Sequence, residues 1–138
     1  MSVMELKIYT DGGSINNPGP SAIAYVIYSN GKIIHSFSAK IGINTNNFAE
    51  YTALVRALER VKQNHVSSSA KITVFSDSRL MVNQLNGLYK VKNSTIRQFV
   101  LKVRILEQEL NVPIVYKYIP RENNRLADSL VKKALQNF

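Results

Sequence analysis

The sequence predicts an α/β fold in which a five-stranded mixed sheet carries helices on both faces. Two observations lead to this prediction. The first 41 residues contain three strand-like segments joined by short polar turns, which favours an antiparallel meander. From residue 45 onward, segments with helical periodicity alternate with short β-branched segments, and such connections require parallel pairing. The predicted order is β-β-β-α-β-α-α-β-α, within a single domain that spans residues 1–138.

The opening meander is predicted from alternating apolar residues and turn-forming residues. Residues 5–10 predict a strand that ends at Asp11, where the following Gly-Gly pair allows a tight turn. After a polar loop, residues 21–28 predict a second strand. Ser-Asn-Gly at residues 29–31 predicts a hairpin turn, and residues 32–41 predict the returning strand.

The second half of the chain is predicted from apolar residues spaced three and four apart. Thr45, Asn46 and Asn47 supply capping side chains for the first helix, Gly87 ends the short helix, and Ser94 is a candidate cap for the long helix. The predicted elements are a helix from the cap to about residue 63, a strand at 71–76, a short helix at 79–86, a helix along 96–110, a strand at 113–119 and a helix at 122–136.

Composition limits the class of protein. The chain has 138 residues, 45% of them hydrophobic, which suffices for the core of one domain, and it contains no cysteine for disulfides or thiolate metal sites. No segment has the roughly 20 apolar residues needed to span a bilayer, and the N-terminal residues do not resemble a signal peptide. We therefore expect a cytoplasmic protein with no membrane association.

The charge balance points to a polyanionic partner. Lys and Arg number 18 against nine acids, which gives a net charge of +9. A basic surplus attracts nucleic acid, although a merely solvated basic surface is the alternative interpretation. The chain's three aspartates, Asp11, Asp77 and Asp128, all lie at the end of an apolar segment or beside an apolar helical stripe, whereas surface acids would be scattered.

Four acidic residues are predicted to converge. Asp11 and Asp77 each follow a predicted strand, and ligands of α/β sheets bind at the carboxyl ends of strands where the strand order reverses. Glu50 heads the inward-facing stripe of the first long helix, and Asp128 borders the buried stripe of the last. Taken singly, each acid is equally typical of a turn, a helix cap or a structural ion pair.

Converging carboxylates repel one another unless a cation lies between them. A set of oxygen ligands without nearby His or Cys suits Mg²⁺ or Mn²⁺ better than zinc. Two such ions would activate a water molecule and stabilise the leaving oxygen of a phosphodiester. The residues alone therefore predict a metal-dependent nuclease.

Motifs in five short segments together resemble type 1 ribonuclease H. They are Tyr-Thr-Asp-Gly-Gly-Ser at 9–14, Asn-Pro-Gly-Pro at 17–20, Thr-Asn-Asn-Phe-Ala-Glu-Tyr at 45–51, Ser-Asp-Ser at 76–78 and Asn-Arg-Leu-Ala-Asp at 124–128. The resemblance spans nearly the whole chain, and the element order matches the ribonuclease H-like fold.

The resemblance implies an activity and its residues. Asp11, Glu50, Asp77 and Asp128 would be the catalytic, metal-binding set for two Mg²⁺ or Mn²⁺ ions, and the reaction would be endonucleolytic hydrolysis of the RNA strand of RNA·DNA hybrids. The implied substrate contacts are Gly12, Gly13 and Ser14 for RNA 2′-hydroxyls, Asn46 and Asn47 for the minor groove, and Asn17 and Thr45 for a phosphate of the DNA strand. Without the resemblance, this glycine and asparagine loop would be interpreted as a turn.

Two departures from the family stand out. Some members carry a histidine in the loop before the last aspartate, but residues 119–124 contain none, while His35 and His65 are predicted to be ordinary surface residues. Some members also insert a basic, tryptophan-containing protrusion, whereas this chain has only residues 87–93 there, typical of a compact branch. Lys90 and Lys92 are candidates for contact with the DNA backbone or lie on an exposed edge.

Two other functions remain open. One is a non-catalytic nucleic-acid-binding module of the same fold, against which the intact set of acids argues, because a pure binder gains from losing negative charge that faces phosphates. The other is a related metal nuclease that acts on double-stranded RNA or branched DNA. The expected partner in the leading interpretation is an RNA·DNA hybrid, bound by a monomer without an obligate protein partner.

Overall fold

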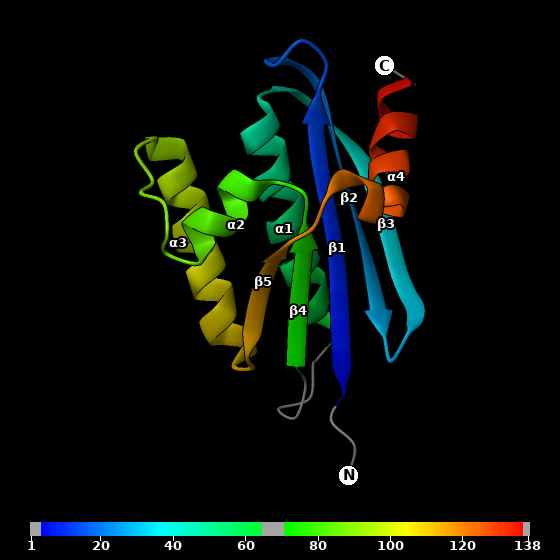
Figure 1. The fold of residues 1–138 in the computed structure, drawn as a ribbon, viewed down its shortest axis with the longest axis vertical. Coiled ribbons are helices and arrows are strands. Elements are labelled where there is room, and N and C mark those ends of the chain that lie inside the picture. Colours follow the sequence, from blue (N-terminus) through cyan, green and yellow to red (C-terminus); the bar gives the residue numbers. More distant parts are fainter. Residues whose placement is uncertain (1–3, 65–70, 137–138) are drawn as a thin grey trace.

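The structure is a computed structural model that describes residues 4–64 and 71–136. Five strands, four α-helices and one 3₁₀ turn follow one another in the predicted order (Figure 1). In chain order they are β1 (Glu5–Ser14), β2 (Gly19–Ser29), β3 (Lys32–Asn44), α1 (Asn46–Gln63), β4 (Lys71–Ser76), α2 (Arg79–Leu85), α3 (Ser94–Leu110), β5 (Ile114–Tyr118), η1 (Arg121–Asn123) and α4 (Arg125–Gln136).

All five strands form one mixed sheet in the order β3-β2-β1-β4-β5. The central strand β1 pairs antiparallel with β2 on one side and parallel with β4 on the other. The chain therefore changes its direction of pairing at β1, as the sequence predicts, and this confirms the predicted mixed α/β sheet. The carboxyl end of β4 consequently lies beside Thr10 of β1, directly before Asp11.

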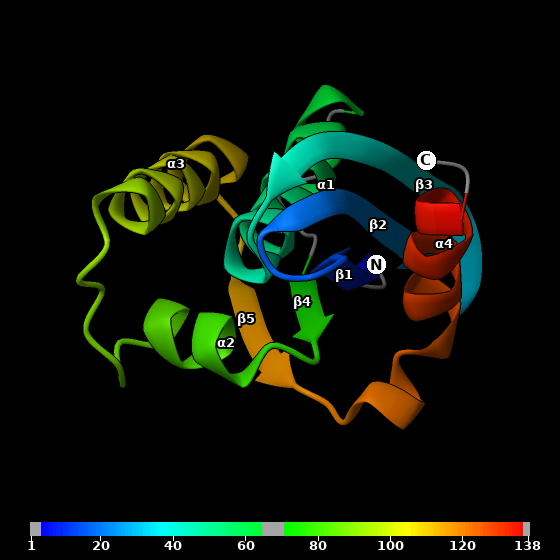
Figure 2. The same cartoon turned by 90° about the horizontal axis from the view of Figure 1, so that it is seen from above.

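Helices cover both faces of the sheet (Figure 2). Alternate residues of β2 show the division, because neighbouring side chains of a strand point to opposite faces. Ile23 packs with Ala49 of α1, whereas Ala22 packs with Val131 of α4. The main core lies on the α1 face, between the sheet and α1, α2 and α3.

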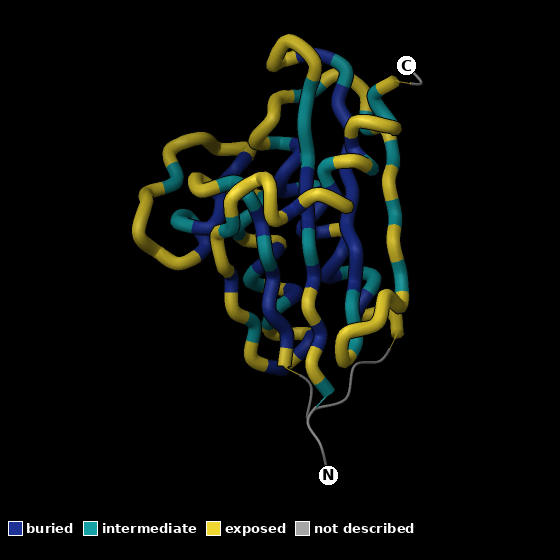
Figure 3. Tube along the Cα trace, turned by 45° about the vertical axis from the view of Figure 1, so that its right-hand side comes forward, coloured by how far each residue is buried: buried dark blue, intermediate teal, exposed yellow. Residues whose placement is uncertain are grey.

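Burial follows this layering (Figure 3). The middle of β2, residues 21–27, is buried throughout, since helices lie on both sides of it. The edge strand β3 is exposed or half-buried along its whole length. None of the helices in the described part of the chain is both long and apolar enough to cross a membrane.

The meander differs from its prediction in where the first strand ends. Asp11 does not end β1 but lies inside it, opposite Ala24, because the antiparallel ladder with β2 continues to the pair of Ser14 and Ser21. The turn comes later, at Asn16, whose φ is 63°. The Gly-Gly pair therefore belongs to the strand.

Two helix starts also differ from the prediction. The final helix begins at Arg125 instead of residue 122, because Asn124, with φ −117° and ψ 36°, leaves the helical conformation and separates η1 from α4. Asn93, not Ser94, caps α3, since its side chain accepts a hydrogen bond from the backbone N–H of Ile96. His65, which is predicted to be an ordinary surface residue, lies outside the described residues.

Candidate functional site

Asp11 and Asp77 lie where the parallel ladder between β1 and β4 ends. The pairing of β1 with β4 ends at Thr10 and Ser76, so each aspartate is the first residue beyond that ladder. Asp11 is held in place by continued pairing with β2 and is only 6% exposed. The predicted neighbourhood of these two acids therefore follows from the backbone register.

Glu50 reaches the same place from α1. The helix begins at Asn46 with Thr45 as its cap, so Glu50 lies early in the helix, on the side that faces β1. It is 7% exposed, and its Oε1 atom has no hydrogen-bond partner among the described residues. A buried, unpaired carboxylate oxygen is costly, and coordination of a cation would satisfy it.

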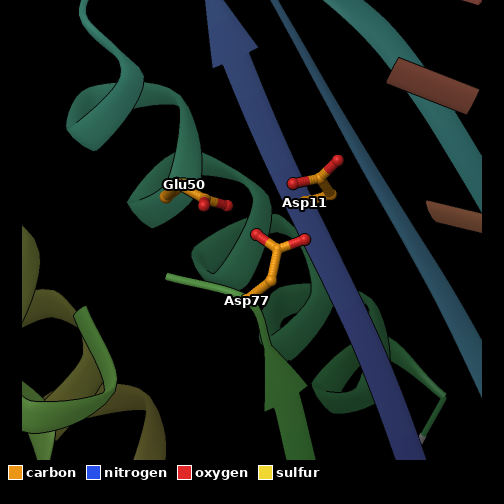
Figure 4. A group of neighbouring side chains, drawn as sticks. All are labelled: Asp11, Glu50 and Asp77. Carbon is orange, nitrogen blue, oxygen red and sulfur yellow. The ribbon is translucent and has the colours of Figure 1, made fainter. Parts of the chain in front are cut away.

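Together these acids form a compact group. Asp11, Glu50 and Asp77 each offer one carboxylate oxygen, and the three oxygens lie within 4.8 Å of one another. The three side chains point toward a common space between β1, α1 and the end of β4 (Figure 4). One cation is thus within reach of ligands from three separate elements of the fold.

The electrostatics of the group show an excess of negative charge. Burial, and then the charges of Asp77 and Asp128, raise the pKa of Asp11 to about 8, against the opposing effects of a Gly12 backbone hydrogen bond and of Arg121. Burial, followed by the charges of Asp11 and Asp77, raises the pKa of Glu50 well above its ordinary value. Burial likewise raises the pKa of Asp77. Each shift would be relieved by a cation among the carboxylates.

Asp128 lies near the group without joining it. Its charge contributes to the raised pKa values of Asp11 and Asp77, which places it nearby. Its carboxylate, however, forms an ion pair with Lys132, one turn further along α4, at 3.0 Å. Of the four acids predicted to converge, the structure thus brings three into one group and places the fourth beside it.

The residues present fit a hard divalent cation. All three groups offer carboxylate oxygens, and such oxygens suit Mg²⁺, Mn²⁺ or Ca²⁺. The unpartnered Oε1 of Glu50 and the raised pKa values are what a metal-binding cluster shows when its own charges are not balanced.

Comparisons with known proteins agree with this geometry. A family model described as reverse transcriptase-like matches residues 9–134. The structure of LC11-RNase H1 in complex with an RNA/DNA hybrid superposes with a TM-score of 0.90 at 41% identity, covering 96% of this chain and 97% of that one. The chain therefore belongs to the type 1 ribonuclease H family.

Other relatives are longer than this chain. The ribonuclease HI of Halobacterium salinarum is 34% identical over 130 residues, which make up 94% of this chain and 63% of that protein. The crystal structure of RNase H1 from that archaeon superposes with a TM-score of 0.89 at 32% identity, over 97% of this chain and 99% of that one. A bifunctional protein of Mycobacterium tuberculosis is 31% identical over 134 residues, only 36% of its length.

The ribonuclease H motif residues at 12–17 and 45–47 are linked to one another. The backbone N–H of Ser14 donates to Asn46 Oδ1 at 2.8 Å, and the backbone N–H of Asn46 donates to Asn17 Oδ1, also at 2.8 Å. These bonds join the last residue of β1 and the loop after it to the first residue of α1. Because both amide oxygens are used within the protein, the NH₂ groups of Asn17 and Asn46 are the parts that offer donors to a ligand.

A surface groove collects most of the remaining predicted contact residues. Asn17, Thr45 and Asn47 line one part of it, and Lys90 and Lys92, from the connection between α2 and α3, line another. That connection comprises only residues 86–93, so the predicted compact form of the family, without an inserted protrusion, is confirmed. Both lysines are exposed, and the groove therefore combines amide and hydroxyl groups with positive charge.

Two residues absent from the predicted set lie at the site. Arg121 of η1 is exposed, and its charge lowers the pKa of Asp11, Glu50 and Asp77. Asn124 is 1% exposed and hydrogen-bonds to Asp77. Asn124 was part of the motif at 124–128. Its position one helical turn before Asp128 is the feature of the sequence that could have identified it as a site residue.

His35, by contrast, lies on β3 beside Tyr25, as expected for a residue of an edge strand.

Proposed function

We propose that this ribonuclease H hydrolyses the RNA strand of RNA·DNA hybrids, with Asp11, Glu50, Asp77 and Asp128 holding two Mg²⁺ or Mn²⁺ ions. The observation that carries the proposal is the group of three carboxylate oxygens within 4.8 Å, one of them buried without a partner. When bound, the ions would supply Lewis-acid activation of water and stabilisation of the leaving oxygen. The single domain, residues 1–138, would act as the catalytic unit.

The chain's own residues would bind and orient the hybrid. The groove lined by Asn17, Thr45 and Asn47 offers uncharged donors suited to a phosphate, and Lys90 and Lys92 add charge along the same path. The half-buried backbone of Gly13 and Ser14 is suited to reading 2′-hydroxyls, the groups that separate RNA from DNA. LC11-RNase H1, which has been solved with an RNA/DNA hybrid, supports this partner.

Arg121 would supply positive charge in the loop where some members of the family carry a histidine. It lies in η1, and its charge acts on Asp11, Glu50 and Asp77 together. An always-protonated guanidinium cannot act as a general base at neutral pH, so its contribution would be to attract the substrate phosphate. Proton transfer would then not depend on Arg121.

The decisive experiment is cleavage of a labelled RNA·DNA hybrid with titrated Mg²⁺ and Mn²⁺, beside matched double-stranded RNA and DNA. We expect metal-dependent fragments from the RNA strand of the hybrid alone. Asp77→Asn should abolish these products while the circular dichroism spectrum stays unchanged. Tight hybrid binding without cleavage at any metal concentration would favour a non-catalytic module. Cleavage of double-stranded RNA would broaden the substrate class.

A further inference from the structure

Asn124 lies at the junction of the three segments that carry the aspartates. It follows η1 and precedes α4, and it is 1% exposed. Its side-chain NH₂ donates to the backbone carbonyl of Thr10 at 2.9 Å and to Asp77 Oδ2 at 3.3 Å. Its own backbone carbonyl accepts from the backbone N–H of Asp128 at 3.0 Å. One residue thus connects the end of the part of β1 that pairs with β4, Asp77 and the first turn of α4.

The chemistry of the bond to Asp77 distinguishes Asn124 from an ordinary structural partner. A lysine or arginine in its place would neutralise Asp77 and compete with a cation, as Lys132 does at Asp128. An amide donor orients the carboxylate and leaves its negative charge intact. It also occupies one lone-pair direction of Oδ2, so that the remaining directions of the carboxylate are left for a metal.

The orientation of the amide is fixed by its surroundings. Both the Thr10 carbonyl and the Asp77 carboxylate are acceptors, so the NH₂ group must face them. The opposite oxygen, Asn124 Oδ1, is buried and has no hydrogen-bond partner among the described residues. A residue kept only for packing would not bury an unpartnered acceptor at this cost, because an apolar side chain of similar shape would fill the space.

We propose that Asn124 is a positioning residue that holds Asp77 in its metal-binding orientation and couples it to β1 and to the helix of Asp128. The inference rests on the proposed function, since it assigns Asn124 to the same metal site. Asn124 itself does not touch the substrate. Its loss should weaken metal affinity by about tenfold, as is typical of residues that orient metal ligands.

The test compares Asn124→Ala and Asn124→Leu with Asn123→Ala. Leucine keeps most of the side-chain volume and loses the donor, which keeps the test informative where the alanine variant does not fold. Asn123 is the exposed neighbour in η1 and serves as the matched control. Calorimetric titration of the intact proteins with Mn²⁺ gives the dissociation constant, and hybrid cleavage at a series of Mn²⁺ concentrations gives the half-saturating concentration and the maximal rate.

We expect both Asn124 variants to raise the dissociation constant and the half-saturating Mn²⁺ concentration about tenfold, while saturating Mn²⁺ restores most of the rate. Asn123→Ala should match the wild type in both measurements. Variants of Asn124 that melt earlier but bind Mn²⁺ as tightly as the wild type would overturn the positioning role and leave the proposed function intact. A wild-type protein that binds no Mn²⁺ would overturn both.

Discussion

Gly12 of β1 lies directly against Ala49 of α1: a Cβ atom built on Gly12 would be 2.4 Å from the carbonyl carbon of Ala49. Real Cβ atoms do not approach backbone atoms so closely, so any larger residue would push the helix away from the strand. Ala49 directly precedes Glu50. The absence of a side chain at Gly12 is therefore what allows Glu50 to reach Asp11.

Gly12→Ala should consequently damage both stability and metal binding. The added methyl group meets rigid backbone atoms on α1, so we expect a loss of about 3 kcal/mol in the free energy of unfolding. The folded fraction should also bind Mn²⁺ more weakly, because Glu50 moves with the helix. Chemical denaturation and calorimetric titration measure the two effects.

Gly13→Ala is the matched control for that substitution. A Cβ atom at Gly13 would lie 3.6 Å from Val131 Cγ1, which is ordinary van der Waals contact. We expect its unfolding free energy to stay within about 1 kcal/mol of the wild type. Equal effects of the two substitutions would contradict the close approach of α1 to β1 as the reason for glycine at residue 12.

The metal-free protein should become less stable as the pH rises from about 4 to about 8. Asp11 has a folded pKa of about 8, compared with an ordinary value of 3.8. Between these values the folded state binds more protons than the unfolded state, so deprotonation with rising pH removes stability. Asp11→Asn removes this ionisation and should raise the stability near pH 8 by several kcal/mol.

Urea denaturation in the presence of a chelator, repeated across this pH range, measures that dependence. Glu5→Gln, which removes an exposed acid at the other end of β1, should leave the slope unchanged. With saturating Mg²⁺ the wild-type slope should change sign, because the metal binds the deprotonated carboxylates of the folded state. A wild-type stability that rises with pH in the chelator would contradict a repulsive group of acids.

The sequence predicted the sheet because its signals are local. Alternating apolar residues, the Asn-Gly turn and the caps of α1 and α2 each act over a few residues, and the order of helices and strands then determines where the parallel pairs form. The neighbourhood of Asp11 and Asp77 followed from that order. Glu50 was predicted to face inward from the spacing of the apolar residues that follow it.

What the sequence did not predict depends on contacts between distant segments. The extension of β1 beyond Asp11 comes from its ladder with β2, and no residue near the Gly-Gly pair signals it. Asn124 bonds to Thr10, which lies 114 residues earlier in the chain. The spacing of four residues between Asp128 and Lys132 is typical of an ion pair along a helix. Whether Lys132 competes with a metal ion for Asp128, however, depends on where α4 packs against the sheet.

Lys90 and Lys92 should control how steeply hybrid binding depends on salt. Both line the groove that also contains Thr45, so each can bind a phosphate and release counterions. Replacing both by alanine should reduce the slope of log affinity against log salt by about 1 for each phosphate that a lysine no longer neutralises. The matched control is the double alanine variant of Lys32 and Lys71, exposed residues that begin β3 and β4, away from the groove.

Binding is measured by fluorescence anisotropy of a labelled hybrid in Ca²⁺ or in a chelator across a salt series, with Asp77→Asn as the background if cleavage interferes. The control pair loses the same charge, so it corrects for the general attraction of a basic protein. Equal reductions of the slope in both double variants would remove Lys90 and Lys92 from the substrate-binding set.

Lys132→Ala should strengthen metal binding. The ammonium group of Lys132 lies 3.0 Å from Asp128 Oδ2, and 65% of its side chain is exposed, so the pair itself contributes little to stability. Removing it frees the carboxylate that lies beside the three grouped acids and removes a competing positive charge. We expect the dissociation constant for Mn²⁺ to fall about two- to fivefold, which corresponds to the range of exposed ion pairs. Lys71→Ala removes the same charge from an exposed residue at the start of β4 and serves as the control in the same calorimetric titration. Unchanged affinity in Lys132→Ala, together with full hybrid cleavage by Asp128→Asn, would show that Asp128 takes no part in the metal site.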